Sequence, residues 1–127
     1  MTTTLTLATL PPSANVIWRT GRSGTYRNPK YVAWLNSEGL LLKSQLRGQT
    51  KFNEPVYVTM PMRRPRINSD ADNRIKPVGD LLQTIGAVSN DKLIDGWKVF
   101  WSTTLPKGIA AQIRIEPVDS GAWAMVA

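Results

Sequence analysis

The chain contains four segments in which hydrophobic and polar residues alternate. These segments are residues 4–7, 56–62, 97–102 and 109–116. A period of two places successive side chains on opposite faces of a sheet, so each segment predicts a strand with one buried face. The segment Pro11-Pro12-Ser13 ends the first strand, and a turn-forming segment at residues 106–108 separates the last two. The pattern therefore predicts that the last two strands form a hairpin.

A helix is predicted after Asn28, where apolar residues recur at helical spacing. They are Val32, Leu35, Gly39, Leu42 and Leu46. Asn28 followed by Pro29 is typical of a helix start, and Arg47 followed by Gly48 is typical of a helix end. We therefore expect this apolar stripe to pack in the core.

A second helix is predicted by the apolar residues that precede Gly86. They are Val78, Leu81, Leu82 and Ile85. A start at Asn73 places Pro77 where it removes a backbone hydrogen bond, whereas a start at Pro77 itself removes this conflict. We predict that the helix begins at Pro77 and that residues 72–76 form a turn.

These elements predict one α+β domain over residues 1–117, with a mixed sheet that carries two main helices. Residues 118–127 show no clear period and are expected to be either disordered or packed on a partner subunit. No run approaches the ~20 apolar residues that span a bilayer, and the first ten residues lack the features of a signal peptide. We therefore expect a cytoplasmic protein without a membrane partner.

The balance of charge favours a polyanionic partner. The chain has 16 Lys and Arg against 9 Asp and Glu, a formal net charge of +7, and basic proteins bind nucleic acid by neutralising phosphates. An exposed loop is predicted over residues 16–28, and its basic and aromatic side chains are Trp18, Arg19, Arg22, Tyr26 and Arg27. This mixture suits backbone contact and base stacking, although the glycines in the loop are equally explained by turns.

Three aspartates are candidate metal ligands. Asp70 and Asp72 follow the basic run at residues 63–66, and Asp91 lies beyond the second predicted helix. Mg²⁺ prefers oxygen ligands, and the absence of Cys and His leaves oxygen as the donor for any metal. The alternative is that the aspartates cap helices. The residues by themselves leave both interpretations open.

The basic residues around these acids also have two interpretations. Lys76 either pairs with Asp72 or Asp80, four residues away, or stabilises charge on a phosphate during the reaction. The run of arginines is either a solvated charged surface or a DNA contact. Its members are Arg63, Arg64 and Arg66.

Four motifs occur in the order found in a known family. They are Leu10-Pro11-Pro12-Ser13-Ala14-Asn15 followed by Arg19, the basic run Arg63 to Arg66, Asp70-Ala71-Asp72-Asn73 through Lys76-Pro77-Val78 and Asp80-Leu81-Leu82, and Asn90-Asp91 after Ile85-Gly86. Over roughly the first 117 residues the chain resembles the RusA-type Holliday junction resolvases of bacteria and phages. In that family the last motif often has two adjacent acids, whereas Asn90 precedes Asp91 here.

The resemblance implies a homodimeric, Mg²⁺-dependent endonuclease that resolves four-way DNA junctions by paired symmetric nicks in recombination and repair. It implies that Asp70, Asp72 and Asp91 are metal ligands and that Lys76 is catalytic. We expect DNA contacts from seven arginines: Arg19, Arg22, Arg27, Arg63, Arg64, Arg66 and Arg74. The alternatives are a non-catalytic protein that binds junction or duplex DNA and a metal-dependent phosphohydrolase that acts on RNA or nucleotides.

Overall fold

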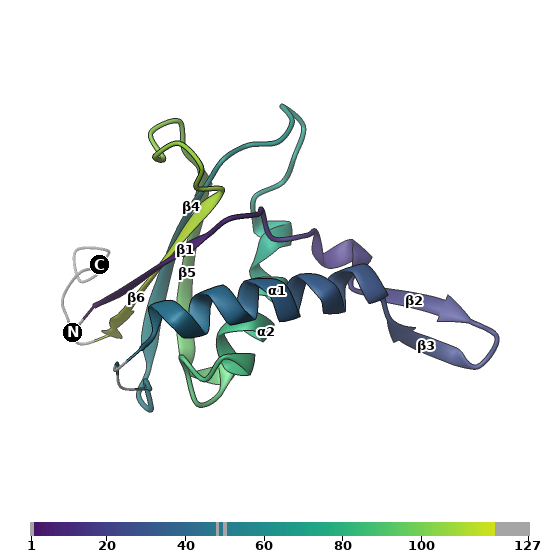
Figure 1. Cartoon of the computed structure of the whole chain (residues 1–127), viewed down its shortest axis with the longest axis horizontal. Helices are drawn as coiled ribbons and strands as arrows, with labels where there is room; N and C mark the ends of the chain where they lie inside the picture. Colours follow the sequence, from purple (N-terminus) through teal and green to yellow (C-terminus); the bar gives the residue numbers. More distant parts are fainter. Residues whose placement is uncertain (1, 48, 50, 119–127) are drawn as a thin grey trace.

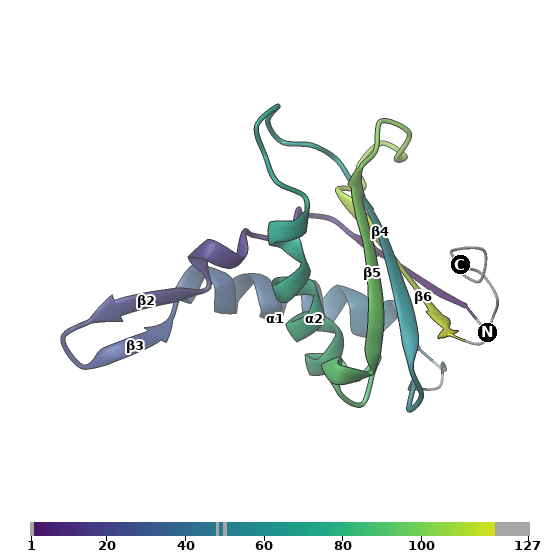
Figure 2. The same cartoon turned by 180° about the vertical axis from the view of Figure 1, so that it is seen from behind.

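The computed structural model describes residues 2–47, 49 and 51–118. It has a four-stranded sheet, two α-helices that pack on one face of this sheet, and a separate two-stranded hairpin that extends away from the body (Figure 1). Figure 2 shows the same two layers from behind, with the sheet on one side and both helices on the other. The prediction of a single α+β domain with a mixed sheet and two main helices is confirmed.

The strand order of the main sheet is β1-β6-β4-β5. The strands are β1 (Thr3–Leu7), β4 (Val56–Met62), β5 (Ile94–Trp101) and β6 (Ala111–Pro117). β5 runs parallel to β4, whereas β6 is antiparallel to both β4 and β1. All four predicted strands are present. The sheet is mixed because it contains both parallel and antiparallel pairs of strands.

The predicted hairpin between the last two strands is wrong, because β4 lies between β5 and β6. β4 buries every second side chain along its whole length, as expected for a strand of a sheet that packs one face on the core. The helix between β4 and β5 makes the crossover that parallel neighbours require. β5 therefore occupies one edge of β4, and the chain passes to the other edge before it forms β6.

Helix α1 (Pro29–Gln45) begins where predicted, because the Asn28 side chain accepts a hydrogen bond from the Lys30 N–H at 3.0 Å. Its buried residues are Tyr31, Leu35, Glu38, Gly39 and Leu42. The prediction that Val32 is in the core is wrong, since this side chain is 37% exposed. Tyr31 takes the inward position, where its hydroxyl finds a polar partner on the second helix.

Helix α2 (Ile75–Thr84) follows the short 3-10 helix η2 (Asp72–Arg74). The predicted start at Pro77 is therefore two residues late. The first N–H groups of a helix have no acceptor within that helix, so a proline in the first turn removes no hydrogen bond. Lys76 consequently lies on a helix rather than in a turn. The predicted apolar face of α2 is confirmed as buried.

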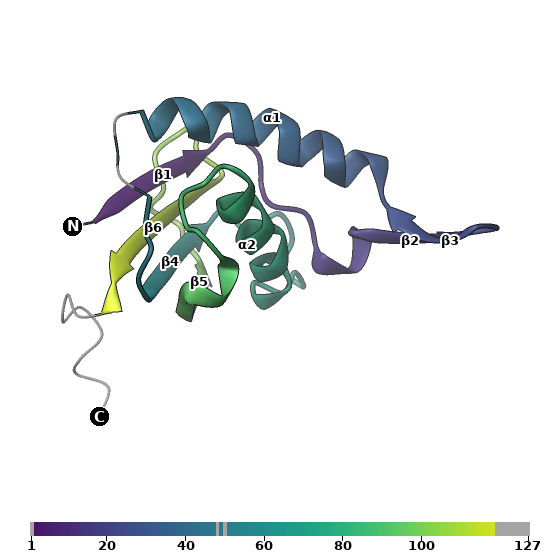
Figure 3. The same cartoon turned by 90° about the horizontal axis from the view of Figure 1, so that it is seen from below.

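The segment predicted as an exposed loop is instead a hairpin of β2 (Trp18–Gly21) and β3 (Gly24–Arg27), which follows the 3-10 helix η1 (Ala14–Val16). We call residues 18–27 the arm. Every residue of its two strands is exposed. The view in Figure 3 shows the arm leaving the molecule beside the N-terminal end of α1. Gly24, at φ 113°, provides the backbone conformation that the turn needs.

The core lies between the sheet and the two helices, and Trp97 and Trp101 pack against it while half-buried. Of the predicted tail, Val118 donates a backbone hydrogen bond to the Pro55 carbonyl at 3.1 Å. The rest of that prediction concerns residues outside the described part of the chain. Within the described residues, no helix has the length and apolar character needed to cross a membrane.

Candidate active site

The predicted catalytic residues lie before α2, on it and after it. Asp70 is in the loop that follows β4, Asp72 opens η2, and Lys76 is the second residue of α2. Asp91 is the first residue of the 3-10 helix η3 (Asp91–Leu93), which leads into β5. The crossover from β4 to β5 therefore carries all four residues, and α2 packs against both η2 and η3.

Lys76 and Asp91 are brought together by this crossover. The Lys76 Nζ lies 3.8 Å from Asp91 Oδ2 and 3.1 Å from Asp80 Oδ1. The Gln83 side chain accepts a hydrogen bond at 3.3 Å from the backbone N–H of Asp91, which holds η3 against α2. The expected pairing of Lys76 with a carboxylate four residues away is thus present, with Asp80 as the partner, and a second carboxylate is added from η3.

Asp80 is the most enclosed acid of this group, with its side chain 13% exposed. Its Oδ2 accepts a hydrogen bond of 2.6 Å from the hydroxyl of Tyr31 on α1 and lies 3.9 Å from an Arg27 guanidinium nitrogen. Burial, reinforced by the hydrogen bond to Asp80, raises the pKa of Tyr31 well above its ordinary value. The phenol therefore stays protonated and donates to Asp80 throughout the usual pH range.

The sequence pattern did not identify this role of Tyr31. Asp80 stands four residues from Lys76, a spacing that indicates a helical pair. Tyr31, however, is 49 residues from Asp80. No periodicity connects residues so far apart in the chain.

Asp70 and Asp72 are exposed. Across the described residues, no three His, Cys, Asp or Glu side chains are grouped closely enough to hold a metal ion. The structure therefore joins Asp91 to Lys76 but does not gather the three predicted ligands into one cage, and the metal site stays a prediction. The donors themselves fit a hard divalent cation, because all three offer carboxylate oxygen.

The alternative that these aspartates cap helices is not supported. Residue Ala71 is at the cap position of η2 and Arg74 at that of α2, and neither helix has a side-chain cap hydrogen bond. At η3 the cap is Asn90, whose Oδ1 accepts a hydrogen bond from the Lys92 N–H at 2.9 Å. Asn90 thus caps η3, and the carboxylate of Asp91 lies beside Lys76 instead.

Three of the seven predicted DNA-contact arginines are bound to the protein's own backbone. Arg63 donates to the carbonyls of Leu105, Pro106 and Ile109 at 3.0–3.3 Å. Arg64 donates to the Ile67 carbonyl at 3.2 Å, and its guanidinium lies 5.7 Å from the Trp101 ring centroid. These contacts shape the loop that ends at Asp70.

Arg74 is the third of these arginines. It donates to the Pro11 carbonyl at 2.6 Å and thereby connects the segment between β1 and η1 to the start of α2. Its Nε is buried without a hydrogen-bond partner, and burial lowers the pKa of Arg74. This side chain therefore joins two parts of the protein.

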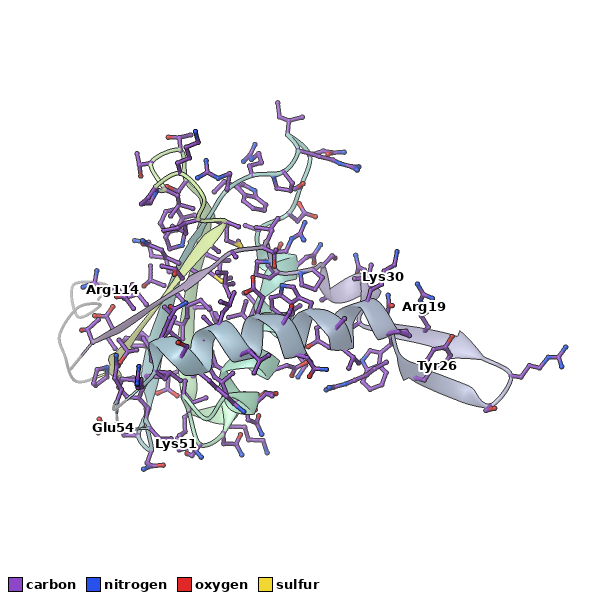
Figure 4. All side chains as sticks on the ribbon, in the orientation of Figure 1. Arg19, Tyr26, Lys30, Lys51, Glu54 and Arg114 are labelled. Carbon is purple, nitrogen blue, oxygen red and sulfur yellow. The ribbon has the colours of Figure 1, made fainter. Side chains whose placement is uncertain are left out.

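The arm and the N-terminal end of α1 present further basic residues. Figure 4 shows Arg19, Tyr26 and Lys30 together in this region, far from the opposite end of the molecule. The guanidinium of Arg27 lies 5.7 Å from the ring centroids of both Trp18 and Tyr31. Aromatic and cationic residues thus pair across the two strands at the base of the arm, where Trp18 faces Arg27 and Arg19 faces Tyr26, and Arg27 also lies 3.9 Å from Asp80.

A small α+β domain with a basic arm and a lysine held between carboxylates has the features of an enzyme that acts on nucleic acid. The family model "Endodeoxyribonuclease RusA" matches residues 9–116. The chain therefore belongs to the RusA endodeoxyribonuclease family, as its motifs indicated, and this is a family of nucleases that in general depend on a divalent metal. None of the curated proteins matches the chain.

Proposed function

We propose that this protein is a Mg²⁺-dependent, structure-selective endonuclease that resolves four-way Holliday junctions by paired symmetric nicks in recombination and repair. The observation that carries the proposal is the position of Lys76 beside Asp91, within a segment matched to a family of endodeoxyribonucleases. Helix α2 and the 3-10 helix η3 thereby present one cation and one carboxylate to the same space.

In this proposal Asp70, Asp72 and Asp91 hold the metal. A divalent cation held by these carboxylates would supply Lewis acidity, both to activate a water molecule and to neutralise charge on the transferring phosphoryl group. Lys76, whose side chain is 60% exposed, can present its ammonium to a non-bridging phosphate oxygen and stabilise the charge that develops on it.

The arginines divide into two groups in the proposed complex. Arg19, Arg22 and Arg27 on the arm, together with the exposed Arg66, contact DNA phosphates. The three arginines that hydrogen-bond to backbone carbonyls maintain the conformation of the loop after β4 and of the segment between β1 and η1, next to the DNA. A homodimer accounts for the paired nicks, because a four-way junction has approximate two-fold symmetry and each cut needs its own site.

The test is cleavage of a labelled synthetic four-way junction with Mg²⁺ and with EDTA. The wild type is compared with Asp70→Asn and with Asp95→Asn, a matched change at an exposed carboxylate on β5. The proposal expects symmetric nicks that need Mg²⁺, are lost in Asp70→Asn and remain in Asp95→Asn. Cleavage by Asp70→Asn at the wild-type rate would contradict the assignment of the metal ligand.

A second candidate function is a non-catalytic protein that binds junction or duplex DNA. It is favoured by one observation, namely that the described residues do not gather three acids into a metal cage. Tight binding to several junction sequences without cleavage in Mg²⁺ or Mn²⁺ would support this second function and contradict the first.

A further inference from the structure

We infer that Asp80 is a positioning residue that holds the ammonium of Lys76 at the active site, and that Tyr31 holds Asp80. This inference rests on the proposed function, in which Lys76 acts on the phosphate. It adds a link from α1 to the reacting centre, because Tyr31 belongs to the helix that begins directly after the arm.

The two oxygens of Asp80 have separate partners. Oδ1 lies 3.1 Å from Lys76 Nζ, and Oδ2 accepts the Tyr31 hydroxyl at 2.6 Å. A carboxylate bound at both oxygens has one orientation, and at 13% exposure it has little room to rotate toward water. Asp80 is itself held in place by the protein and can therefore restrict the motion of Lys76, whose own side chain is largely exposed.

The Lys76–Asp80 pair is arranged against its own helix. Lysine precedes aspartate, the reverse of the order that stabilises isolated helices more strongly. Lys76 is also in the first turn of α2, where the positive end of the helix dipole disfavours a cation. The pair is therefore poorly suited to stabilising α2, and its geometry instead directs the ammonium toward Asp91, 3.8 Å away.

Tyr31 is well suited to anchor this arrangement. It is 1% exposed and lies in the first turn of α1, whose start is capped by Asn28. Asn28 is itself buried, caps the helix, and donates from its side chain to the Val16 carbonyl at 3.0 Å. The donor to Asp80 thus comes from a well-supported position, whereas Arg27, at 3.9 Å and 45% exposed, is a weaker partner.

The first test uses single-turnover cleavage of a four-way junction. Asp80→Asn should lower the cleavage rate about tenfold or more and change the junction Kd, measured in EDTA, less than about twofold, because Asp80 acts on the reacting group and not on binding. Asp95→Asn should change neither. In a Lys76→Ala background, Asp80→Asn should cause no further loss, since its effect passes through Lys76. A further loss in that background, or a wild-type rate for Asp80→Asn alone, would overturn the inference.

The second test needs neither metal nor DNA. NMR relaxation of the side-chain ammonium groups should show Lys76 more ordered than the exposed Lys98 in the wild type. Tyr31→Phe, which keeps the ring, and Asp80→Asn should both raise the mobility of Lys76 to that of Lys98. Equal mobility of the two lysines in the wild type would refute positioning. Should the wild type cut no junction, the proposed function fails while this measurement still decides the role of Asp80.

Discussion

Replacing Tyr31 by phenylalanine removes one hydroxyl from the interior and leaves the ring in place. The hydroxyl donates a 2.6 Å hydrogen bond to Asp80, and Tyr31 is 1% exposed. Hydrogen bonds to charged groups contribute about 1.5–3 kcal/mol to stability, and a buried acceptor without its donor keeps the cost of desolvation. We therefore expect Tyr31→Phe to lower the free energy of unfolding at pH 7 by about 1.5–3 kcal/mol.

The difference between wild type and variant should shrink in alkali. Burial and the hydrogen bond to Asp80 raise the pKa of Tyr31 in the folded protein, whereas in the unfolded chain the phenol ionises at about pH 10. Above that pH the unfolded state binds fewer protons than the native state, so the stability of the wild type falls as pH rises. One such group lowers the free energy of unfolding of the wild type by about 1 kcal/mol between pH 10 and pH 11. Tyr31→Phe lacks the ionisable hydroxyl and should not show this loss.

Urea unfolding followed by tryptophan fluorescence at pH 7, 10 and 11 measures this effect. Tyr26→Phe, at an exposed position on the arm, is the matched control and should change the free energy of unfolding by less than about 0.5 kcal/mol. An equal stability of Tyr31→Phe and wild type at pH 7, or a difference that stays constant up to pH 11, would refute the role assigned to the hydroxyl.

Three other predictions test the rest of the structure. Asn28→Ala removes the cap of α1 and a contact to the base of the arm, so thermal unfolding should report a loss of about 0.5–2 kcal/mol, and the arm should be cut faster in limited proteolysis. Leu82→Ala in the core should cost about 2–5 kcal/mol in urea unfolding. Arg66→Ala should reduce the log–log salt slope of junction binding by about one unit, whereas Arg63→Ala, at a guanidinium bound to three carbonyls, should leave that slope unchanged.

Local periodicity was sufficient where one face of an element meets the core. The alternation over residues 56–62 and the apolar face of α2 both correspond to buried side chains. Periodicity was insufficient to decide which residue of α1 faces the core at positions 31 and 32, because Tyr31 and Val32 are adjacent and either side chain is apolar enough to be buried. The choice between them depends on Asp80, which offers a hydrogen-bond acceptor to the tyrosine from another helix.

In the candidate site, too, the sequence predicted some features and the tertiary structure decided others. The order of the motifs identified the family, and the residue types identified Lys76 and the aspartates as candidates. The pattern did not separate Arg63, which hydrogen-bonds to the loop before β6, from the exposed Arg66. Both are arginines in one basic run, and their environments differ only through residues about forty positions further along the chain.

The sequence by itself therefore determined the fold class, the buried faces of β4 and α2, the basic character of the arm and the family, because each follows from residue types and spacings along the chain. The tertiary structure alone decided that β4 lies between β5 and β6 and that Tyr31, Asp80, Lys76 and Asp91 form one connected group. The physical reason is that strand neighbours and buried hydrogen-bond partners are selected by long-range packing, which leaves no period in the sequence.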